Sequence, residues 1–454
     1  MSRDYVLRGG TVVRPGHATQ RLDILVRGGH VAGLLKPGEP VAEGVAEKPV
    51  AGLHVLPGCI DAHVHFGFGE KITEYEMETA YAAQGGITTI VAYFLNNEAY
   101  GEVFRRESEY AKTRCRVDYG FHFSTASELH IKELESYVKD YGVTSFKYFM
   151  NFKGEEGRYL GLDGTDDGYL YDLLRESSRI GKPTIVCHTE NIEIVNRVRR
   201  RIQAAGGETL KDWAAAKPAF TEAENCIRAM YFAEQLDARV YFPHLSSRLA
   251  VDEVRKWRSR YGEIYAETCP HYLTHCEDSD IGPIGKANPP FKSADDRDAL
   301  WEGLADGTIN VVGSDHSARR RATKEKPLWL AAQGFPGIDD PAGAAVRRLQ
   351  QGAAIARAHR RCADLRASEG LRPATVERPH RRRKRRRLHD RRREPRARRH
   401  AVGVGLLHRL QPVRRAEVEG LAGRDDRARR HRDEGSQADR RARLRQVPAT
   451  HARR

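Results

Sequence analysis

Residues 57–65 read Pro57-Gly58-Cys59-Ile60-Asp61-Ala62-His63-Val64-His65, a short apolar run that ends in two histidines one residue apart. Alternate side chains of a β-strand point to the same side, so on a strand His63 and His65 could bind one metal ion together. Taken alone, such a pair also fits ordinary surface or core histidines. Its interpretation therefore depends on the sequence around it.

Beyond residue 57 the chain alternates apolar runs with segments of helix length, such as 169–179 and 221–236. Eight buried strands that alternate with helices are typical of an α/β protein with a (β/α)8 TIM barrel. We therefore predict a barrel domain over residues 58–340. Its strands are expected at 58–66, 87–93, 117–123, 144–150, 183–187, 239–243, 263–268 and 309–313.

The segment before the barrel has a different pattern. Short β-type runs over 5–10, 23–29 and 30–34 are separated by Gly-Gly turns, which predicts a small antiparallel β unit. We assign residues 1–57 to the N-terminal part of a small β-sandwich domain.

Residues 341–454 form a third region with an unusual composition. They contain 34 Arg and one Lys against 12 Asp and Glu, a charge of +23, whereas residues 1–340 hold 42 basic and 50 acidic residues, a charge of −8; the sum is the +15 of the whole chain. None of the 36 aromatic residues lies after residue 340, so this tail has little apolar surface to bury.

Three interpretations of the tail remain open. An Arg run at 381–387 suits a basic arm for RNA or DNA, and a solvated disordered tail is the second possibility. We favour the third, a GC-rich gene translated out of frame, because Arg, Ala, Gly and Pro codons are GC-rich and the AT-rich Phe, Tyr, Asn and Lys codons are nearly absent. We expect a disordered or misfolded tail.

A lysine among aromatic residues ends the fourth predicted strand, in Ser145-Phe146-Lys147-Tyr148-Phe149. Burial disfavours an ammonium ion and lowers the lysine pKa. A neutral amine can add carbon dioxide and become an anionic carbamate, which would suit bridging two cations. The alternative for Lys147 is an ordinary lysine whose charged end reaches solvent.

Further polar residues follow the other predicted strands. His188 ends the fifth strand, His244 the sixth, and Asp315 follows the eighth. Each could be a core polar group with its hydrogen bonds satisfied. Their common position, at the carboxyl ends of strands where a TIM barrel keeps its active site, favours a shared site.

Together these segments resemble the cyclic amidohydrolases, the family of dihydropyrimidinase, hydantoinase, allantoinase and dihydroorotase. The resemblance covers about residues 4–340 and rests on residues 57–65, 85–89, 145–147, 188–191, 267–273, 288–290 and 313–316. It implies the metal-dependent hydrolase type of TIM barrel, with a small β domain built from both chain ends. It further implies that His63, His65 and Asp315 hold one metal ion, that His188 and His244 hold a second, and that carbamylated Lys147 bridges them.

The expected reaction is hydrolysis of a non-peptide C–N bond in a cyclic amide. Two cations can generate a bridging hydroxide at neutral pH and polarise the ring carbonyl, and Asp315 would be the general base. We expect two divalent metal ions, zinc in the first place with manganese, cobalt or nickel as alternatives, and carbon dioxide for the carbamate.

The substrate is less well specified, because the chain departs from each subgroup. Dihydroorotase has an Arg after His-x-His where this chain has Phe66, and hydantoinases have a Tyr at the position of Phe152. Asn288 before Pro289-Pro290 is more like dihydroorotase. We assign Phe152 and Asn288 to substrate binding. Hydantoin-like or dihydropyrimidine-like rings are our first choice, because Phe66, Phe68 and Phe152 suggest an apolar pocket without a fixed cation; dihydroorotase- and allantoinase-like activities are the alternatives.

Other classes of function remain as alternatives: an inactive or scaffold homologue, and a nucleic-acid binder that uses the basic tail. Scattered cysteines without a CxxC pair, no apolar stretch of ~18 residues and no signal-peptide pattern predict a cytoplasmic protein without a membrane partner. A natively folded chain would form a dimer or tetramer.

The tail interpretation can be tested by limited proteolysis. Family members close the β domain and cap the barrel with elements after the eighth strand, which this tail does not offer, so we expect a chain that is poorly folded beyond about residue 340 and inactive. A protease specific for Arg should digest the region after Asp340 rapidly and leave a resistant N-terminal fragment. A tail as resistant as the barrel would contradict the out-of-frame interpretation.

Overall fold

The computed structural model describes residues 4–14, 17–67, 71–159, 161–162 and 164–339. The Arg-rich tail, with every expectation placed on it, lies outside the described residues, as does Phe68. Each part of the chain is therefore described by itself.

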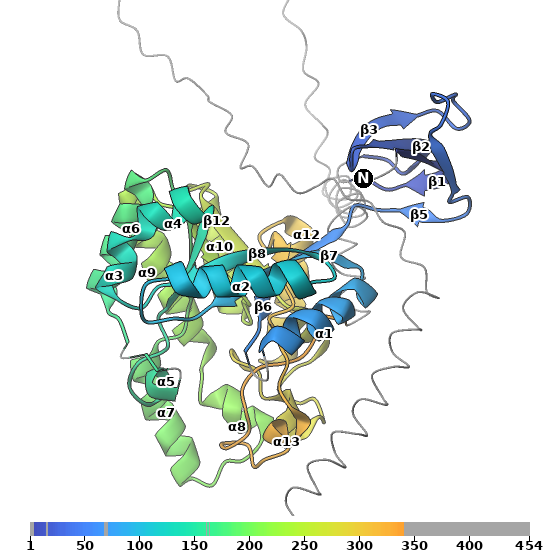
Figure 1. Cartoon of the computed structure of the whole chain (residues 1–454). Coiled ribbons are helices and arrows are strands. Elements are labelled where there is room, and N and C mark those ends of the chain that lie inside the picture. The colour runs from blue at the N-terminus through green and yellow to red at the C-terminus, as the bar shows by residue number, and fades with distance from the viewer. Residues whose placement is uncertain (1–3, 15–16, 68–70, 160, 163, 340–454) are drawn as a thin grey trace, which may run out of the picture. The chain divides into compact units, whose positions relative to one another are not determined.

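A parallel sheet closed into a barrel forms the main body (Figure 1). Its order is β13-β12-β11-β10-β9-β8-β7-β6-β14, and the two end segments β13 and β14 are halves of one strand interrupted by three residues. Nine segments thus make eight strands, because β13 pairs with β12 and β14 pairs with β6. The TIM barrel predicted from the sequence is confirmed. The segments are β6 (Cys59–His65), β7 (Ile87–Phe94), β8 (Asp118–Ser124), β9 (Ser145–Phe149), β10 (Thr184–His188), β11 (Val240–Phe242), β12 (Ile264–Thr268), β13 (Val311–Val312) and β14 (His316–Ser317).

Helices follow the strands and surround the barrel (Figure 1). The predicted helical segments 169–179 and 221–236 are found as α6 and α9. The helices are α1 (Lys71–Gln84), α2 (Gly101–Arg114), α3 (Glu128–Lys132), α4 (Leu134–Tyr141), α5 (Gly154–Tyr159), α6 (Asp167–Arg179), α7 (Ile192–Ala204), α8 (Leu210–Ala215), α9 (Ala219–Leu236), α10 (Arg248–Arg258), α11 (Pro270–Thr274), the 3-10 helix η1 (Gly282–Gly285), α12 (Ala294–Asp306) and α13 (Arg321–Lys324).

Local sequence fixes where several helices begin. Asp166 accepts a hydrogen bond from the Tyr169 backbone N–H and starts α6, and Asn191 does the same at α7. Ser293 and Asp296 form a capping box at α12. Each cap satisfies an otherwise unpaired N–H group in the first turn. The cap at α7 matters for the site, because Asn191 fixes the chain three residues after His188, a predicted site residue at the end of β10.

The barrel core is built from apolar side chains that the strands and helices share. Aromatic residues fill much of it, and the Tyr100 and Phe123 rings stack with centroids 4.0 Å apart. Burial of such side chains from water is the main force that holds strands and helices together. The strand ends are thereby held rigidly enough to position polar groups.

The N-terminal sheet holds five strands, β1 (Tyr5–Val12), β2 (Gln20–Arg27), β3 (His30–Leu35), β4 (Ala46–Pro49) and β5 (His54–Val55). The first three are antiparallel, as the sequence predicts. The expectation of a wholly antiparallel unit is wrong, because β4 and β5 both pair parallel with β1. Their short runs do not stand out in the sequence, since β4 is exposed along its whole length and β5 has only two residues.

Within the described residues, no helix combines the length and the apolar character needed to cross a bilayer.

Candidate active site

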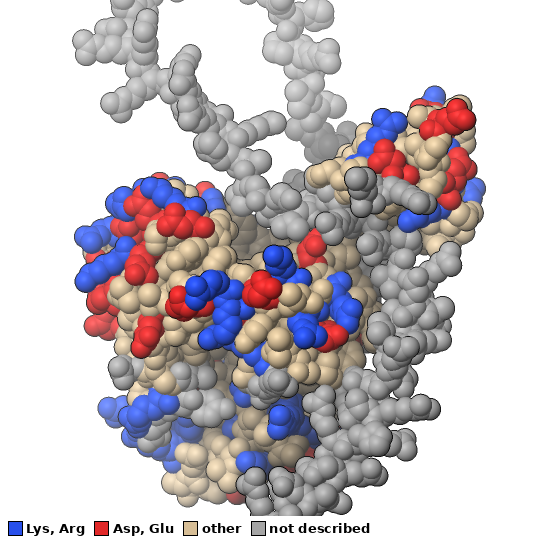
Figure 2. All heavy atoms as spheres, viewed as in Figure 1, with Lys and Arg blue, Asp and Glu red and all other residues tan. Residues whose placement is uncertain are grey.

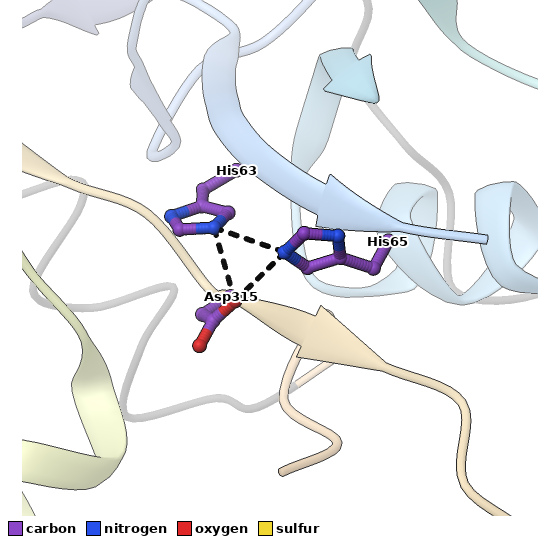
Figure 3. A group of neighbouring side chains, drawn as sticks. All are labelled: His63, His65 and Asp315. Carbon is purple, nitrogen blue, oxygen red and sulfur yellow. Dashed lines mark hydrogen bonds and ion pairs between the residues drawn. The ribbon is translucent and has the colours of Figure 1, made fainter. Parts of the chain in front are cut away.

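Three of the predicted site residues, His63, His65 and Asp315, lie close together where the end of β6 adjoins the middle of the eighth strand (Figure 3). Asp315 Oδ1 lies 3.0 Å from His63 Nε2 and 3.2 Å from His65 Nε2, and the two Nε2 atoms are 3.1 Å apart. Both histidines come from one strand at the spacing of two that puts side chains on one side. Asp315 sits between β13 and β14 in a left-handed backbone conformation, with φ of 48°.

A buried carboxylate sets the direction of the His63 ring. His63 Nδ1 donates to Glu267 Oε1 at 2.7 Å, so Nε2 is left to face Asp315. Glu267 is itself held by the Tyr241 hydroxyl and by the His244 backbone N–H. Burial lowers the pKa of His63, but the carboxylates of Glu267 and Asp315 outweigh burial and raise it to about 9. Histidines that bind metals are commonly oriented by such a carboxylate.

The eighth strand can pass close to Glu267 and His63 only because residue 313 is a glycine. A Cβ atom on Gly313 would lie 2.4 Å from Glu267 Oε2 and 2.8 Å from the Cβ of His63. Residue 313 directly precedes the Ser-Asp pair that ends in Asp315, so its lack of a side chain lets the eighth strand pass close to the other two.

Lys147, His188 and His244 lie in the same cavity as His65 and Asp315. The Lys147 side chain is buried, with Nζ 4.9 Å from the centre of the Tyr93 ring. Burial lowers the pKa of Lys147 to about 8, although Asp315 and Glu267 act in the opposite direction. A part of the amine is therefore neutral near pH 7.

The rings of His188 and His244 meet edge to face, with centroids 4.4 Å apart. The pKa values of both are lowered by burial, and that of His65 falls to about 4 for the same reason. These imidazoles are therefore neutral at pH 7, the form that binds metal ions. Burial raises the pKa of Asp315, but the nearby His63 charge and the hydrogen bonds from His63 and His65 prevail and hold it well below its usual value.

These side chains fit a metal site of the kind that the sequence predicts. His244 Nδ1 is buried and has no hydrogen-bond partner among the described residues, so a donor atom is available. Neutral imidazoles with an ionised carboxylate are the ligand set that zinc and other late first-row divalent ions prefer. His63, whose pKa is raised to about 9, would lose its proton when a metal ion binds. Six side chains from five strands thus converge. His65, Lys147, His188, His244 and Asp315 line one cavity, and His63 lies beside it in contact with His65 and Asp315. The strands are β6, β9, β10, β11 and the eighth strand.

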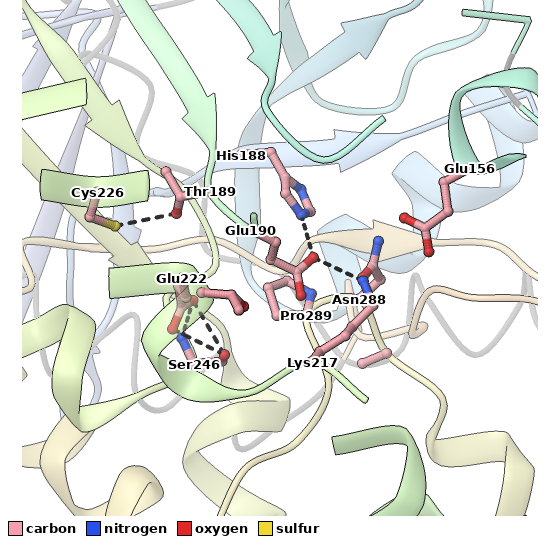
Figure 4. Close-up of polar contacts among 12 residues, drawn as sticks. Glu156, His188, Thr189, Glu190, Lys217, Glu222, Cys226, Ser246, Asn288 and Pro289 are labelled. Carbon is pink, nitrogen blue, oxygen red and sulfur yellow. Dashed lines mark hydrogen bonds and ion pairs between the residues drawn. The ribbon is translucent and has the colours of Figure 1, made fainter. Parts of the chain in front are cut away.

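A chain of charged contacts connects His188 to Asn288 (Figure 4). His188 Nε2 donates to Glu190 Oε2 at 2.9 Å, and the fully buried Lys217 ammonium donates to that same oxygen at 3.0 Å and to Asn288 Oδ1. Sequence reasoning gave Glu190 no role and missed Lys217. Glu190 could have been noticed two residues after His188, whereas Lys217 follows α8 without any motif.

The cavity has a volume of about 1030 Å³. Phe66, Phe152 and Asn288 line it. Phe152 and Asn288 are the two residues predicted to bind substrate. The expectation of an apolar pocket without a fixed cation is wrong, since many basic side chains also line it. These are Lys71, Arg199, Lys286, Arg319, Arg320 and Lys326. Lys and Arg side chains are also exposed on the surface near α5 and α7 (Figure 2).

The sequence and fold of this chain are similar to those of several known proteins. An allantoinase of Escherichia coli is 30% identical over 348 residues, which cover 75% of each chain. Dihydropyrimidinase from Brevibacillus agri matches with a TM-score of 0.68 and 27% identity over 78% of each chain. L-Hydantoinase from Arthrobacter aurescens matches with a TM-score of 0.68 and 28% identity over 75% of each chain. No family model matches the chain.

The Glu190–Lys217 pair yields a prediction about stability. Lys217→Met should lower the free energy of unfolding by about 3–5 kcal/mol, because Glu190 would remain as a buried charge without its cation. Adding Glu190→Gln should recover much of the loss. Urea denaturation measures both.

The matched control is Lys211→Met, which removes a pair with Asp278 in which both side chains are more than half exposed. It should change the free energy of unfolding by less than about 1 kcal/mol. Equal losses at the two lysines, or a double variant no better than Lys217→Met, would contradict the described pairing.

Proposed function

This chain belongs to the cyclic amidohydrolases, which hydrolyse C–N bonds of cyclic amides, and we propose that it opens a ring amide with two divalent metal ions. The observation that carries the proposal is the convergence of the six predicted ligands: five line one cavity, and His63 lies within 4.8 Å of two of them, His65 and Asp315. A scaffold protein of this fold would have no need of that convergence.

The proposed ligands divide into two sets. His63, His65 and Asp315 would hold one ion, and their donor atoms already lie within 4.8 Å of one another. His188 and His244 would hold the other, since Glu190 occupies Nε2 of His188 and leaves its Nδ1 as the donor. When bound, the two ions supply a nucleophilic water at neutral pH and polarise the ring carbonyl.

Lys147 would bridge the two ions as a carbamate. Its amine is buried against Tyr93 and Phe149 and is partly neutral, which is the form that adds carbon dioxide. No carboxylate that the structure describes hydrogen-bonds to this amine, so it is not committed to an ion pair. Zinc is the first choice of metal, and manganese, cobalt and nickel suit the same ligands.

Asp315 is the proposed general base. Its carboxylate faces the cavity and is held by His63 and His65, so it can take a proton from the attacking water and pass it to the leaving ring nitrogen. Cleavage of the C–N bond then opens the ring, which leaves a carboxylate at one end of the product and the protonated ring nitrogen, as a ureido NH2 for a hydantoin or dihydropyrimidine ring, at the other.

Asn288 and Phe152 are proposed to contact the ring. Lys217 holds Oδ1 of Asn288, which leaves the Nδ2 group to donate to a ring carbonyl. Phe152 lies with its ring centroid 5.9 Å from that of His188 and offers an apolar surface but no donor. A ring of the hydantoin or dihydropyrimidine type suits both; an allantoin ring, which is itself a hydantoin, suits them equally, and the allantoinase relatives favour that second candidate.

Lys147→Ala should remove most of the bound metal, because the bridge between the two ions would be lost. Metal content of the purified full chain is measured by mass spectrometry after loading with zinc and bicarbonate, a readout that does not require an active chain. Lys153→Ala is the control, since Lys153 pairs at the surface with the exposed Glu193. Equal metal loss in both variants would contradict the bridge.

Asp315→Asn should keep much of the metal, because a ligating oxygen remains. In any preparation of the chain that opens the ring, it should lower turnover by at least ~10²-fold, because the base is gone. Ring opening of hydantoin, dihydrouracil and allantoin is followed relative to the unsubstituted chain. Turnover close to that of the unsubstituted chain would place the base elsewhere.

A further inference from the structure

A fully buried lysine, Lys217, lies behind one of the proposed metal ligands (Figure 4). Its ammonium donates to Glu190 Oε2 at 3.0 Å and to Asn288 Oδ1. Its Nζ also lies 5.1 Å from the centre of the Trp213 ring, so an aromatic face covers the remaining side of the charge. A buried ammonium keeps its charge only where such partners surround it, which fixes Lys217 in one position.

The backbone near Lys217 is held by further contacts. The buried Lys292 ammonium donates to the Lys217 carbonyl oxygen. Trp213 on α8 donates through Nε1 to the Ala287 carbonyl at 2.8 Å, which ties the segment before Asn288 to the same helix. The two acceptors of Lys217 therefore do not depend on its side chain alone to stay within reach.

The Glu190 carboxylate depends on Lys217 for its position. Glu190 is 1% exposed, and its Oε2 accepts both from Lys217 and from His188 Nε2, the latter at 2.9 Å. Its Oε1 is buried and has no hydrogen-bond partner among the described residues. Without Lys217, Glu190 would be a buried anion held only by an imidazole in the part of the chain that the structure describes.

The His188 ring in turn takes its direction from Glu190. With Nε2 bonded to the carboxylate, Nδ1 is the nitrogen left for a metal ion. The His244 ring lies edge to face with that of His188, so a rotated His188 would no longer direct Nδ1 to an ion shared with His244. A carboxylate on the far nitrogen of a metal-binding imidazole fixes its tautomer and strengthens it as a ligand.

We propose that Lys217 is a positioning residue for the second metal ion: it holds Glu190, which holds His188 with Nδ1 directed to that ion. The inference rests on the proposed function, because it assumes that His188 and His244 share an ion. Lys217 itself touches neither the ion nor the ring, and it leaves the site of His63, His65 and Asp315 unaffected.

Stepwise zinc binding tests the proposal on the purified full chain, stripped of metal and titrated against a chelating dye in the presence of bicarbonate. His244→Ala identifies the binding step that belongs to the second ion. Lys217→Met should weaken that step by about 10–100-fold, the loss typical when the partner of a ligand histidine is removed, and leave the other step nearly unchanged.

The double variant Lys217→Met/Glu190→Gln separates positioning from stability. It should recover much of the free energy of unfolding, because no buried charge is left without a partner. It should keep the weakened zinc step, because the carboxylate that directs His188 is gone. A lysine with only a structural role would let stability and zinc binding recover together. The double variant also keeps the test valid if Lys217→Met fails to fold.

Lys324→Met is the matched control. Lys324 is also buried, at 3% exposed, but its ammonium donates to the backbone carbonyls of Lys286 and Gly334, and its side chain does not line the cavity. This variant loses a buried ammonium, as Lys217→Met does. It should nevertheless keep both zinc steps of the unsubstituted chain.

The inference is overturned if Lys217→Met binds the second ion as tightly as the unsubstituted chain, if the double variant regains that step along with its stability, or if Lys324→Met weakens it equally. An unsubstituted chain that binds fewer than two zinc ions would overturn the proposed function and the inference with it. The zinc-loaded chain is assayed separately for ring opening. A chain that shows these effects on zinc binding without opening any ring would contradict the proposed function and leave the positioning role of Lys217 supported.

Discussion

The hydrogen bond between His63 and the buried carboxylate of Glu267 is the contact on which the rest of the site depends. It joins the first and seventh strands of the barrel and leaves one nitrogen of His63 to face Asp315. The same carboxylate accepts from the His244 backbone and from Tyr241, so one buried charge on β12 positions groups on two other strands, β6 and β11. Gly313 is required beside it, because any side chain there would meet both partners. A carboxylate buried so deeply is stable only when its hydrogen bonds are made.

The barrel and its main polar residues could be predicted from sequence because both depend on local patterns. Apolar runs at regular spacing indicate the strands, and His63, His65 and Asp315 stand where strands end. Lys217 and Glu267 could not be given their roles in this way, since each acts through a contact with a residue far away in the chain. The same holds for β4 and β5, whose pairing with β1 is a long-range choice that their composition does not reveal.

The substrate pocket was the part of the site that the sequence predicted least well. Phe66 and Phe152 do line the cavity, but basic side chains from α7 and from the segments around η1 and α13 line it as well. Those positions depend on how loops fold over the barrel mouth, for which no strand pattern exists. The resulting cavity has neutral histidines near the proposed metal ions and a charged, hydrogen-bonding wall at Glu156 and Arg199.

The central claim is that six side chains bind two metal ions bridged by a modified lysine, and anomalous X-ray diffraction from crystals of the zinc-loaded chain tests it most directly. The account predicts two anomalous peaks, one beside His63, His65 and Asp315 and one beside His188 and His244. Electron density for a carbamate on Lys147 should lie between them. A single peak with an unmodified Lys147, or no peak in the cavity, would contradict the account.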